Sequence, residues 1–459
     1  MSVAASLPTS GLGMREIAAA AKGASRVLAT LDESRRNAAL EAMARAVELA
    51  SAELVVANDE DMRAESEGLA PATLARLKLD EAKLAEMVGQ VRSVAELPDP
   101  LGRVLDAIEL DEGLNLTKVS VPLGVLAAIF EARPDAVTQI AALAVKSGNA
   151  VILKPGREVE GTVGVLVRVL REALVRCGLP VDAVSLVVGR ERVQELLGMH
   201  GLVDMVIPRG SKALVEYVQA NTRIPVLGHG EGVCHIYVDQ SADEALALRV
   251  IEDAKTDYPA ACNAVETVLV HRAIAAEFLP RLAERLRARG VTLHGDAMVR
   301  ELLRGVEVEA VEDWHREYGE LAVSLGVVAS VDAAMEHIHA HGSAHTESVI
   351  AEDVVVAERF LLEVDAASVM HNASTRFADG FRYGFGAEVG ISTSKLHARG
   401  PVGLEGLTTY KYVLRGTGQV AGDYRVSKET GRAARVFTHR VSKRRVSKRR
   451  VSKRQTETR

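Results

Sequence analysis

The feature that most constrains the fold is an alternation of short apolar runs with segments of helical periodicity between residues 124 and 239. The apolar runs have the length of buried strands. They span 124–130, 149–156, 184–189 and 205–208. The helical segments span 136–147, 163–177 and 212–221. This alternation predicts a parallel, doubly wound sheet that binds a nucleotide at its carboxyl edge. The Gly-x-Gly-x-x-Gly fingerprint of standard dinucleotide-binding folds is absent after the first strand.

Other segments extend this α/β pattern on both sides. Apolar residues recur at helical spacing from about residue 14 to 90, which predicts several amphipathic helices. Residues 103–121 have the pattern of a β-hairpin with its turn at 111–113. A second α/β unit extends from 243 to about 394, and residues 407–416 alternate as a strand. Such a hairpin is typical of an oligomer edge, and an ordinary surface hairpin explains the pattern equally well.

Cys262 lies just before a buried-strand pattern in the second α/β unit. The small residues Ala260, Ala261 and Ala264 surround it, and the valine-rich run 265–270 follows. A thiol held at the end of a rigid element and left accessible by small neighbours is suited to act as a nucleophile. An inert buried cysteine is the alternative, because free cysteine is among the most buried residue types. The stretch by itself leaves both interpretations open.

Composition excludes several classes of protein. The chain of 459 residues has three cysteines and no Cys-x-x-Cys spacing. This argues for a reducing, cytoplasmic compartment and against a disulfide framework or a zinc site. No apolar run approaches the roughly 20 residues that a bilayer span requires, so no membrane partner is expected. The N-terminus does not have the pattern of a secretory signal.

The charge is distributed unevenly along the chain. Residues 440–459 carry ten Lys/Arg and one Glu, which leaves a balance of −15 on residues 1–439. A body of that sign is a poor nucleic-acid surface. The VSKRR repeats cannot bury a core, and we expect residues 421–459 to form a disordered basic tail. The tail is either an anion-binding segment, with Ser442, Ser447 and Ser452 as phosphorylation candidates, or, as we prefer, an extension without a catalytic role.

Nine segments, in this order, resemble one family. They are LPDPLG (97–102), VPLGV..IFEARPDAV (121–137), KSGNAVIL (146–153), IPRGSKALVEYV (207–218), DYPAACNAVETVLVH (257–271), GSAHTE (342–347), NASTRFADG (372–380), FGAEVGIST (385–393) and KLHARGPVGLEGLTTYKY (395–412). Together they are similar to the γ-glutamyl phosphate reductases of the aldehyde dehydrogenase superfamily, from about Arg15 to Val420.

The resemblance implies an aldehyde-dehydrogenase-like α/β fold in three parts. Residues 1–102 and 122–238 would form a doubly wound NADP-binding domain, and 239–404 an α/β catalytic domain. Residues 103–121 and 405–416 would form a β oligomerisation flap whose strands pair across subunits, so the resemblance implies at least a dimer. The matched body starts almost at the N-terminus, so a separate glutamate kinase is expected to supply the substrate.

The resemblance makes Cys262 the nucleophile of an NADPH-dependent reduction of L-glutamyl 5-phosphate to L-glutamate 5-semialdehyde. The thiolate displaces phosphate, and the resulting thioester accepts a hydride. Arg133 takes the position of an oxyanion-stabilising Asn in aldehyde-oxidising relatives, and it would steady the carbonyl oxygen or the departing phosphate. Gly228 stands where those relatives have a water-activating Glu, and a reductase has no use for that base. Glu231, three positions away, is interpreted as a surface residue.

The family pattern also points to cofactor and substrate residues. For the cofactor they are Lys154, Arg157, Gly210, Ser211 and Glu317. Arg157 stands three residues after Lys154, where NAD-preferring relatives have Glu, and a cation there favours the 2′-phosphate of NADPH. A solvated loop arginine is the alternative. The residues expected near the substrate are Asn372, Ser374, Thr375 and Arg376, although loop structure alone would also explain them.

Two alternatives to a reductase stay open, and one metal interpretation is rejected. An aldehyde-oxidising dehydrogenase would need a glutamate base, and a non-catalytic binding protein would not need the cysteine stretch. His337, His339, His341 and His345 invite a metal site, but Gly342 interrupts the helix that such spacing requires. We therefore expect no metal.

Overall fold

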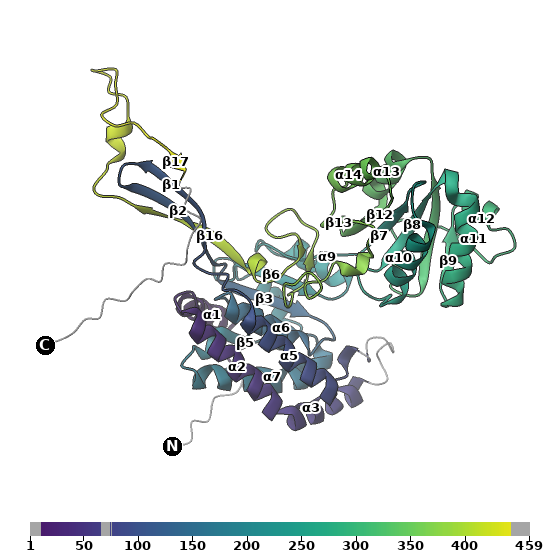
Figure 1. Ribbon diagram of the computed structural model, residues 1–459. Coiled ribbons are helices and arrows are strands. Elements are labelled where there is room, and N and C mark those ends of the chain that lie inside the picture. The colour runs from purple at the N-terminus through teal and green to yellow at the C-terminus, as the bar shows by residue number, and fades with distance from the viewer. Residues whose placement is uncertain (1–10, 66–73, 75, 442–459) are drawn as a thin grey trace.

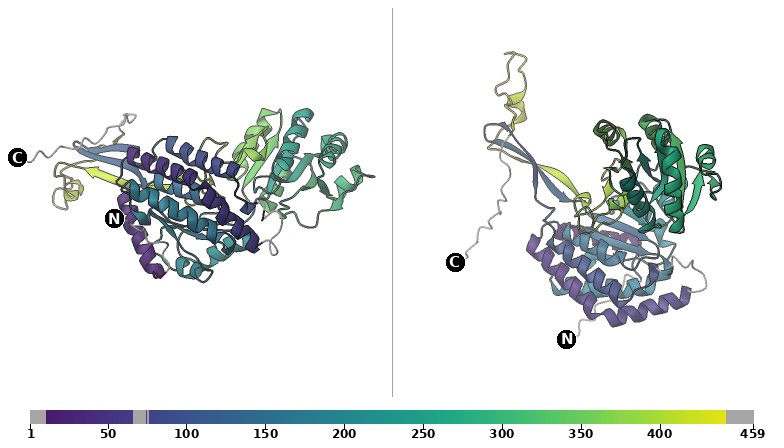
Figure 2. Two further views of the ribbon diagram at one scale, coloured as in Figure 1. Left: turned by 90° about the horizontal axis from the view of Figure 1, so that it is seen from below. Right: turned by 45° about the vertical axis from the view of Figure 1, so that its right-hand side comes forward.

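The computed structural model describes residues 11–65, 74 and 76–441. Two α/β units and one long β-sheet flap make up this part of the chain (Figure 1). The two further views in Figure 2 show the flap reaching away from both units. None of the described helices is long and apolar enough to cross a bilayer.

The first unit is built on a parallel sheet in the order β5-β4-β3-β6. Its strands are β3 (Val125–Phe130), β4 (Ala150–Pro155), β5 (Val184–Leu186) and β6 (Met205–Arg209). All residues of β3 and β4 are buried, as expected for parallel strands covered on both faces. The chain moves from β3 outward to β5 and then returns to place β6 on the other side of β3, which creates a topological switch point between β3 and β6.

Helices cover both faces of this sheet. They are α1 (Met14–Leu28), α2 (Glu33–Leu49), α3 (Ser51–Glu65), α5 (Glu81–Glu96), α6 (Ala136–Lys146), α7 (Glu160–Arg176), α8 (Arg192–Leu197) and α9 (Lys212–Asn221). The right-handed crossovers place α6 and α7 on one face, where α2, α3 and α5 pack against them, while α8 contacts α1 and α9. Asp32 caps α2, because its carboxylate accepts a hydrogen bond from Arg35 N at 2.9 Å.

The second unit has a parallel sheet in the order β10-β9-β11-β8-β7-β12-β13. The strands are β7 (Cys234–Val238), β8 (Val265–His271), β9 (Thr292–Gly295), β10 (Glu309–Ala310), β11 (Ala322–Val328), β12 (Thr346–Ile350) and β13 (Ser368–His371). The helices are α10 (Glu244–Thr256), α11 (Arg272–Ala288), α12 (Ala297–Leu302), α13 (Val331–His341) and α14 (Val354–Glu363). Strands β8, β7 and β12 are neighbours, so their amino ends meet at one edge of the sheet.

The flap is a four-stranded sheet in the order β16-β2-β1-β17. Strands β1 (Val104–Asp111) and β2 (Leu114–Pro122) form the predicted hairpin, whose Gly113 adopts a φ of +70°. Strand β16 (Thr408–Arg415) pairs antiparallel with β2 along its whole length. The two short strands β14 (Ile391–Ser392) and β15 (Gly400–Pro401) pair antiparallel with each other in the loops that precede β16.

The expectation of a disordered tail from residue 421 onward is wrong for residues 421–441. A short 3-10 helix (Ala421–Tyr424) begins this segment, and β17 (Arg440–Val441) returns to pair with β1. Tyr424 Oη donates a hydrogen bond to Asp111 Oδ2 at 2.8 Å, and Thr438 N donates one to Leu110 O at 2.8 Å. These bonds join residues 421–441 to polar groups of the flap and hold the segment in place. The VSKRR repeats from Ser442 onward, including their three serines, lie outside the described residues.

A cluster of histidines lies between α13 and the second sheet. The ring of His337 is 4.7 Å from that of Trp314, 4.6 Å from that of His341 and 5.5 Å from that of His235. His235 is fully buried and contacts the carboxylate of Glu347 at 3.0 Å. Burial, with the neighbouring imidazoles adding to it, lowers the pKa of His337 to about 3.

We expect the contribution of His337 to the stability of the protein to become unfavourable as the pH drops from 7.5 to 5.0. The unfolded chain binds a proton at His337 near pH 6.5, whereas the folded chain binds it only near pH 3. The unfolded state therefore holds more protons in this window, and the group lowers the free energy of unfolding by up to about 2 kcal/mol at pH 5.0. Thermal unfolding followed by circular dichroism at the two pH values measures the effect.

The substitution His337→Gln should reduce the difference between the two melting temperatures, while the same change at the exposed His200 should leave it as in the parent protein. An equal pH dependence in the parent and in His337→Gln would contradict the assignment.

Candidate active site

The chemistry-bearing residues gather where the two α/β units face each other. Arg133 follows β3 and Arg209 ends β6, so both stand at the carboxyl edge of the first sheet, on either side of its switch point. Cys262 precedes β8 and His345 precedes β12, at the amino edge of the second sheet. The pKa of Arg209 is lowered by burial and by the nearby charge of Arg133, while the thiol of Cys262 acts in the opposite direction. Arg209 therefore lies near both Arg133 and Cys262.

The backbone of Cys262 is held by its neighbours. A Cβ atom added at Gly232 would lie 1.8 Å from the carbonyl oxygen of Cys262, so only glycine allows this close approach. The buried Cys234 thiol donates a hydrogen bond to the same carbonyl at 3.3 Å. Asn263 Nδ2 donates to Ala378 O at 2.9 Å and anchors the loop on its other side. The thiol of Cys262 itself stays half-buried, as a nucleophile must.

Two histidines accompany the thiol. Cys262 Sγ and one ring nitrogen each of His229 and His345 all lie within 4.8 Å of one another. His229 Nδ1 lies 3.0 Å from Ile391 O and donates to that carbonyl, which leaves the lone pair on Nε2. His345 follows Ala344, which has a φ of +57° and turns the chain into the edge of the sheet. An imidazole that moves from this separation into hydrogen-bond reach of the thiol can take its proton.

A pair of arginines faces the same space. Arg209 donates from Nη1 to Gln139 Oε1 at 3.3 Å. The carboxylate of Glu388 partly balances the two cations, and burial raises its own pKa. Arg133 follows Ala132, whose φ of +47° redirects the chain after β3. Two cations beside a thiol form a site that can accept the charge of a phosphate group.

The predicted cofactor residues of the first unit line its carboxyl edge. Lys154 is buried in β4, and desolvation lowers its pKa, with Glu160 and Glu158 acting against the shift. Arg157 is exposed on the turn that follows. Ser211 caps α9, and its backbone N–H donates to Glu131 Oε2 at 2.8 Å. The N-terminus of α9 is a suitable place for an anionic group such as a pyrophosphate.

Two further predicted cofactor positions have defined surroundings. Gly210 packs closely against the carboxylate of Glu131, which would have to move to make room for a Cβ atom there, since the two would lie 2.3 Å apart. Glu317 is half-buried in the loop between β10 and β11. Gly319 N, two residues on, donates to the buried Glu266 at 3.4 Å, which fixes that loop to the second sheet.

The predicted substrate loop is tied to the protein itself. Asn372 bonds the backbone of Ala351 with both ends of its amide, at 3.0 and 3.1 Å. Arg376 donates from Nε to Asp257 Oδ2 at 3.1 Å, five residues before the nucleophile, and lowers the pKa of that carboxyl together with Arg382.

The other two residues of this loop are also buried. Ser374 caps the 3-10 turn Thr375–Phe377. Thr375 is fully buried, and its Oγ1 has no hydrogen-bond partner among the described residues.

The position expected for a water-activating glutamate carries no such base. Gly228 packs against Pro208, with 3.3 Å between an added Cβ atom and that ring. The carboxylate of Glu231 forms an ion pair of 2.7 Å with Lys212 at the start of α9. Cys234 is fully buried and therefore does not resemble a nucleophile. Cys177 is half-buried like Cys262, but it follows α7 and packs against the core of the first unit, where its thiol donates to Ala38 O at 3.9 Å.

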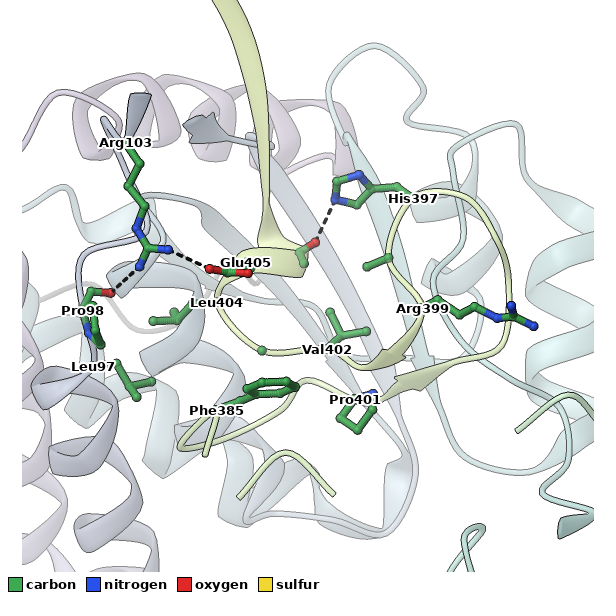
Figure 3. Close-up of a pocket in the computed structure, with 13 residues that line it drawn as sticks. Leu97, Pro98, Arg103, Phe385, His397, Arg399, Pro401, Val402, Leu404 and Glu405 are labelled. Carbon is green, nitrogen blue, oxygen red and sulfur yellow. Dashed lines mark hydrogen bonds and ion pairs between the residues drawn. The ribbon is translucent and has the colours of Figure 1, made fainter. Parts of the chain in front are cut away.

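A separate cavity of 580 Å³ lies at the base of the flap (Figure 3). An ion pair of 2.7 Å between Arg103 and Glu405 closes one side, and His397 Nε2 donates to Gly406 O at 3.0 Å on another. Neither Cys262 nor any other predicted site residue lines it.

Comparisons with known proteins agree with this architecture. The aldehyde dehydrogenase family model matches residues 12–301. A γ-glutamyl phosphate reductase from Cyanothece sp. is 53% identical over 95% of this chain and 99% of its own length. γ-Glutamyl phosphate reductase 1 from Synechocystis sp. is 51% identical over 91% of this chain and 96% of its own length. The crystal structure of γ-glutamyl phosphate reductase from Thermotoga maritima superposes with a TM-score of 0.86 at 40% identity, covering 88% of this chain and 99% of that one.

The chain belongs to the γ-glutamyl phosphate reductase family. Of the residues that the family resemblance indicated, Arg133 and Cys262 both lie near Arg209, and Lys154, Arg157, Gly210 and Ser211 lie at the carboxyl edge of the first sheet, whereas Glu317 lies in a loop of the second unit. Sequence reasoning missed Arg209, although IPRGSK was one of the matched segments. It also missed His229, which stands in the LGHGEG turn, and it considered His345 only as one of a row of histidines.

We predict that Gly232→Ala strongly reduces turnover in this γ-glutamyl phosphate reductase family member. The added methyl group must displace the backbone of Cys262. A misplacement of about 1 Å at a reacting atom costs on the order of 100-fold in rate. Steady-state kinetics and the rate of alkylation of Cys262 by iodoacetamide measure the displacement.

Gly89→Ala in α5 is the matched control, because a Cβ atom there meets nothing within 4 Å. This variant should keep the parental rate and gain up to about 1 kcal/mol of helix stability. Parental turnover in Gly232→Ala would show that the close approach is dispensable.

Proposed function

We propose that the chain catalyses the NADPH-dependent reduction of L-glutamyl 5-phosphate to L-glutamate 5-semialdehyde with release of phosphate, the second step of proline biosynthesis. The observation that best supports this is the position of Arg209, which lies near both the Cys262 thiol and Arg133. A thiol forms the acyl intermediate, and paired cations suit an acyl phosphate better than an uncharged aldehyde.

In the first step, Cys262 attacks the acyl carbon and the C–O bond to phosphate breaks. An imidazole of the His229–His345 pair takes the thiol proton, and the departing phosphate can receive it. Arg133 and Arg209 stabilise the charge that develops on the leaving group or the carbonyl oxygen. The thioester that results keeps the energy of the acyl phosphate in a form that accepts a hydride.

In the second step, the thioester is reduced and the resulting thiohemiacetal collapses to the aldehyde and free thiolate. A bound nicotinamide cofactor supplies the hydride. Lys154, Arg157, Gly210, Ser211 and Glu317 would hold it, and the capped N-terminus of α9 fits its pyrophosphate. A reductase must avoid hydrolysis of the thioester, which agrees with Gly228 in place of a glutamate.

Oligomerisation through the flap belongs to this proposal. The flap exposes a group of large apolar side chains, and a second subunit would cover them. They are Leu105, Tyr410, Tyr412 and Leu414. A separate kinase that phosphorylates the γ-carboxylate of glutamate would supply the labile substrate. The cytoplasmic location stays a prediction, to which the three unpaired cysteines contribute.

The reaction is most easily tested in reverse. With glutamate 5-semialdehyde, inorganic phosphate and NADP⁺, we expect reduced nicotinamide to form only when phosphate is present. Cys262→Ala should lower the rate at least about 1,000-fold, because the acyl intermediate is lost, while Cys177→Ala should retain it. Product formation without phosphate would mean that water resolves the thioester and would favour an aldehyde-oxidising dehydrogenase. A folded protein without any turnover would favour a binding function.

The preference for NADPH is expected to depend on Arg157. Three carboxylates lie near Lys154 and repel an anion at the carboxyl edge of the first sheet: those of Glu160, Glu158 and Glu191. The attraction of the exposed Arg157 guanidinium for the 2′-phosphate must therefore exceed this repulsion. Loss of one charge-assisted contact costs about 1.5–3 kcal/mol, so Arg157→Ala should raise the KM for NADPH at least about 10-fold and leave the KM for NADH nearly unchanged. Arg26→Ala on α1 is the control. Equal changes for both cofactors would contradict this role.

A further inference from the structure

The cluster of Cys262, His229 and His345 has the composition of a metal site. One thiol and two imidazoles are the donors that zinc prefers in proteins. Their three donor atoms lie within 4.8 Å of one another, and they come from separate loops at the amino ends of β7, β8 and β12. This is the one group of three possible metal ligands that the described part of the chain contains.

Both imidazoles are prepared to act as ligands. The hydrogen bond from His229 Nδ1 to Ile391 O leaves Nε2 unprotonated, which is how metal-binding histidines are usually held. His345 is fully buried, and its Nδ1 is engaged with Thr346 Oγ1 at 2.9 Å. Its Nε2 is buried and has no hydrogen-bond partner among the described residues. An unpaired buried nitrogen costs free energy that a ligand would recover.

The three donor atoms need to move only slightly closer together to bind one zinc ion. Donor atoms of a tetrahedral zinc ion lie roughly 3.3–3.6 Å apart, as follows from Zn–N and Zn–S bonds of about 2.1 and 2.3 Å. His229 and Cys262 are half-buried and can rotate toward the fixed His345. Three protein ligands leave a fourth position open for water or for the phosphate that the reaction releases.

We propose that Zn²⁺ binds reversibly to Cys262, His229 and His345 and inhibits the enzyme. The ion displaces the thiol proton to solvent and takes the sulfur lone pair, so the thiolate can no longer attack an acyl carbon. Mg²⁺ and Ca²⁺ prefer oxygen ligands and do not bind here. This inference goes beyond the proposed reaction, and metal binding can be measured without any substrate.

The test uses Co²⁺ as a spectroscopic substitute for Zn²⁺ on the full-length protein. We expect one Co²⁺ per chain, with the visible bands of tetrahedral cobalt and a thiolate-to-cobalt charge-transfer band, and displacement by one equivalent of Zn²⁺. Cys262→Ser should lose the charge-transfer band. His345→Gln should weaken binding at least about 100-fold, since even a partner behind a ligand contributes 10–100-fold. His315→Gln, an exposed histidine outside the cluster, should bind as the parent does.

Two measurements on the parent protein complete the design. Equimolar Zn²⁺ should slow the alkylation of Cys262 at least 10-fold, and it should abolish turnover until EDTA restores it, whereas Mg²⁺ should do neither. Cobalt bound without a thiolate band, or bound equally well by His345→Gln, would overturn the proposal. Loss of binding in His315→Gln would also overturn it and would assign the metal to the histidines of α13.

Discussion

The position of the nucleophile depends on one close backbone contact. Gly232 passes so near the carbonyl of Cys262 that a methyl group has no room, and the buried Cys234 thiol bonds the same oxygen from below. Both residues stand at the start of β7, the central neighbour of β8 and β12. Because parallel pairing aligns the amino ends of these strands, the contact also sets where His345 lies relative to the thiol. A local packing constraint thereby fixes the geometry of three residues distant in sequence.

The charged residues near the Cys262 thiol favour the binding of a multiply charged anion. Arg133 and Arg209 repel each other across the switch point of the first sheet, and Glu388 compensates only part of their charge. Both arginines are half-buried, and two neighbouring cations whose charge is only partly compensated favour the binding of an anionic group. A phosphate group at the acyl carbon would compensate this charge in the ground state and more so as it departs. The same two cations would give little advantage with an uncharged aldehyde.

Periodicity predicted the elements well, but not the contacts between them. The strands of both units and the hairpin are visible in the sequence because burial on two faces or one face imposes its own pattern. His229, Cys262 and His345 are separated by 33 and 83 residues. No local pattern indicates that the amino ends of three strands meet, or that Ala344 adopts a left-handed conformation. The ordering of residues 421–441 was missed because the adjacent basic repeats dominated the composition, whereas pairing of β17 with β1 is a tertiary effect.

His229 and His345 could promote hydrolysis of the acyl intermediate, and the presence of Gly228 in place of a glutamate does not by itself prevent this. An imidazole that can take a proton from a thiol can also take one from water, and hydrolysis would waste the acyl intermediate. The protection must therefore be geometric. His345 is fully buried, and His229 is held by Ile391 O. Gly228 has no side chain that could activate water, and the carboxylate of Glu231 is engaged in an ion pair with Lys212. The site thus separates activation of sulfur from activation of water by placing the only nearby imidazoles among the described residues next to the sulfur.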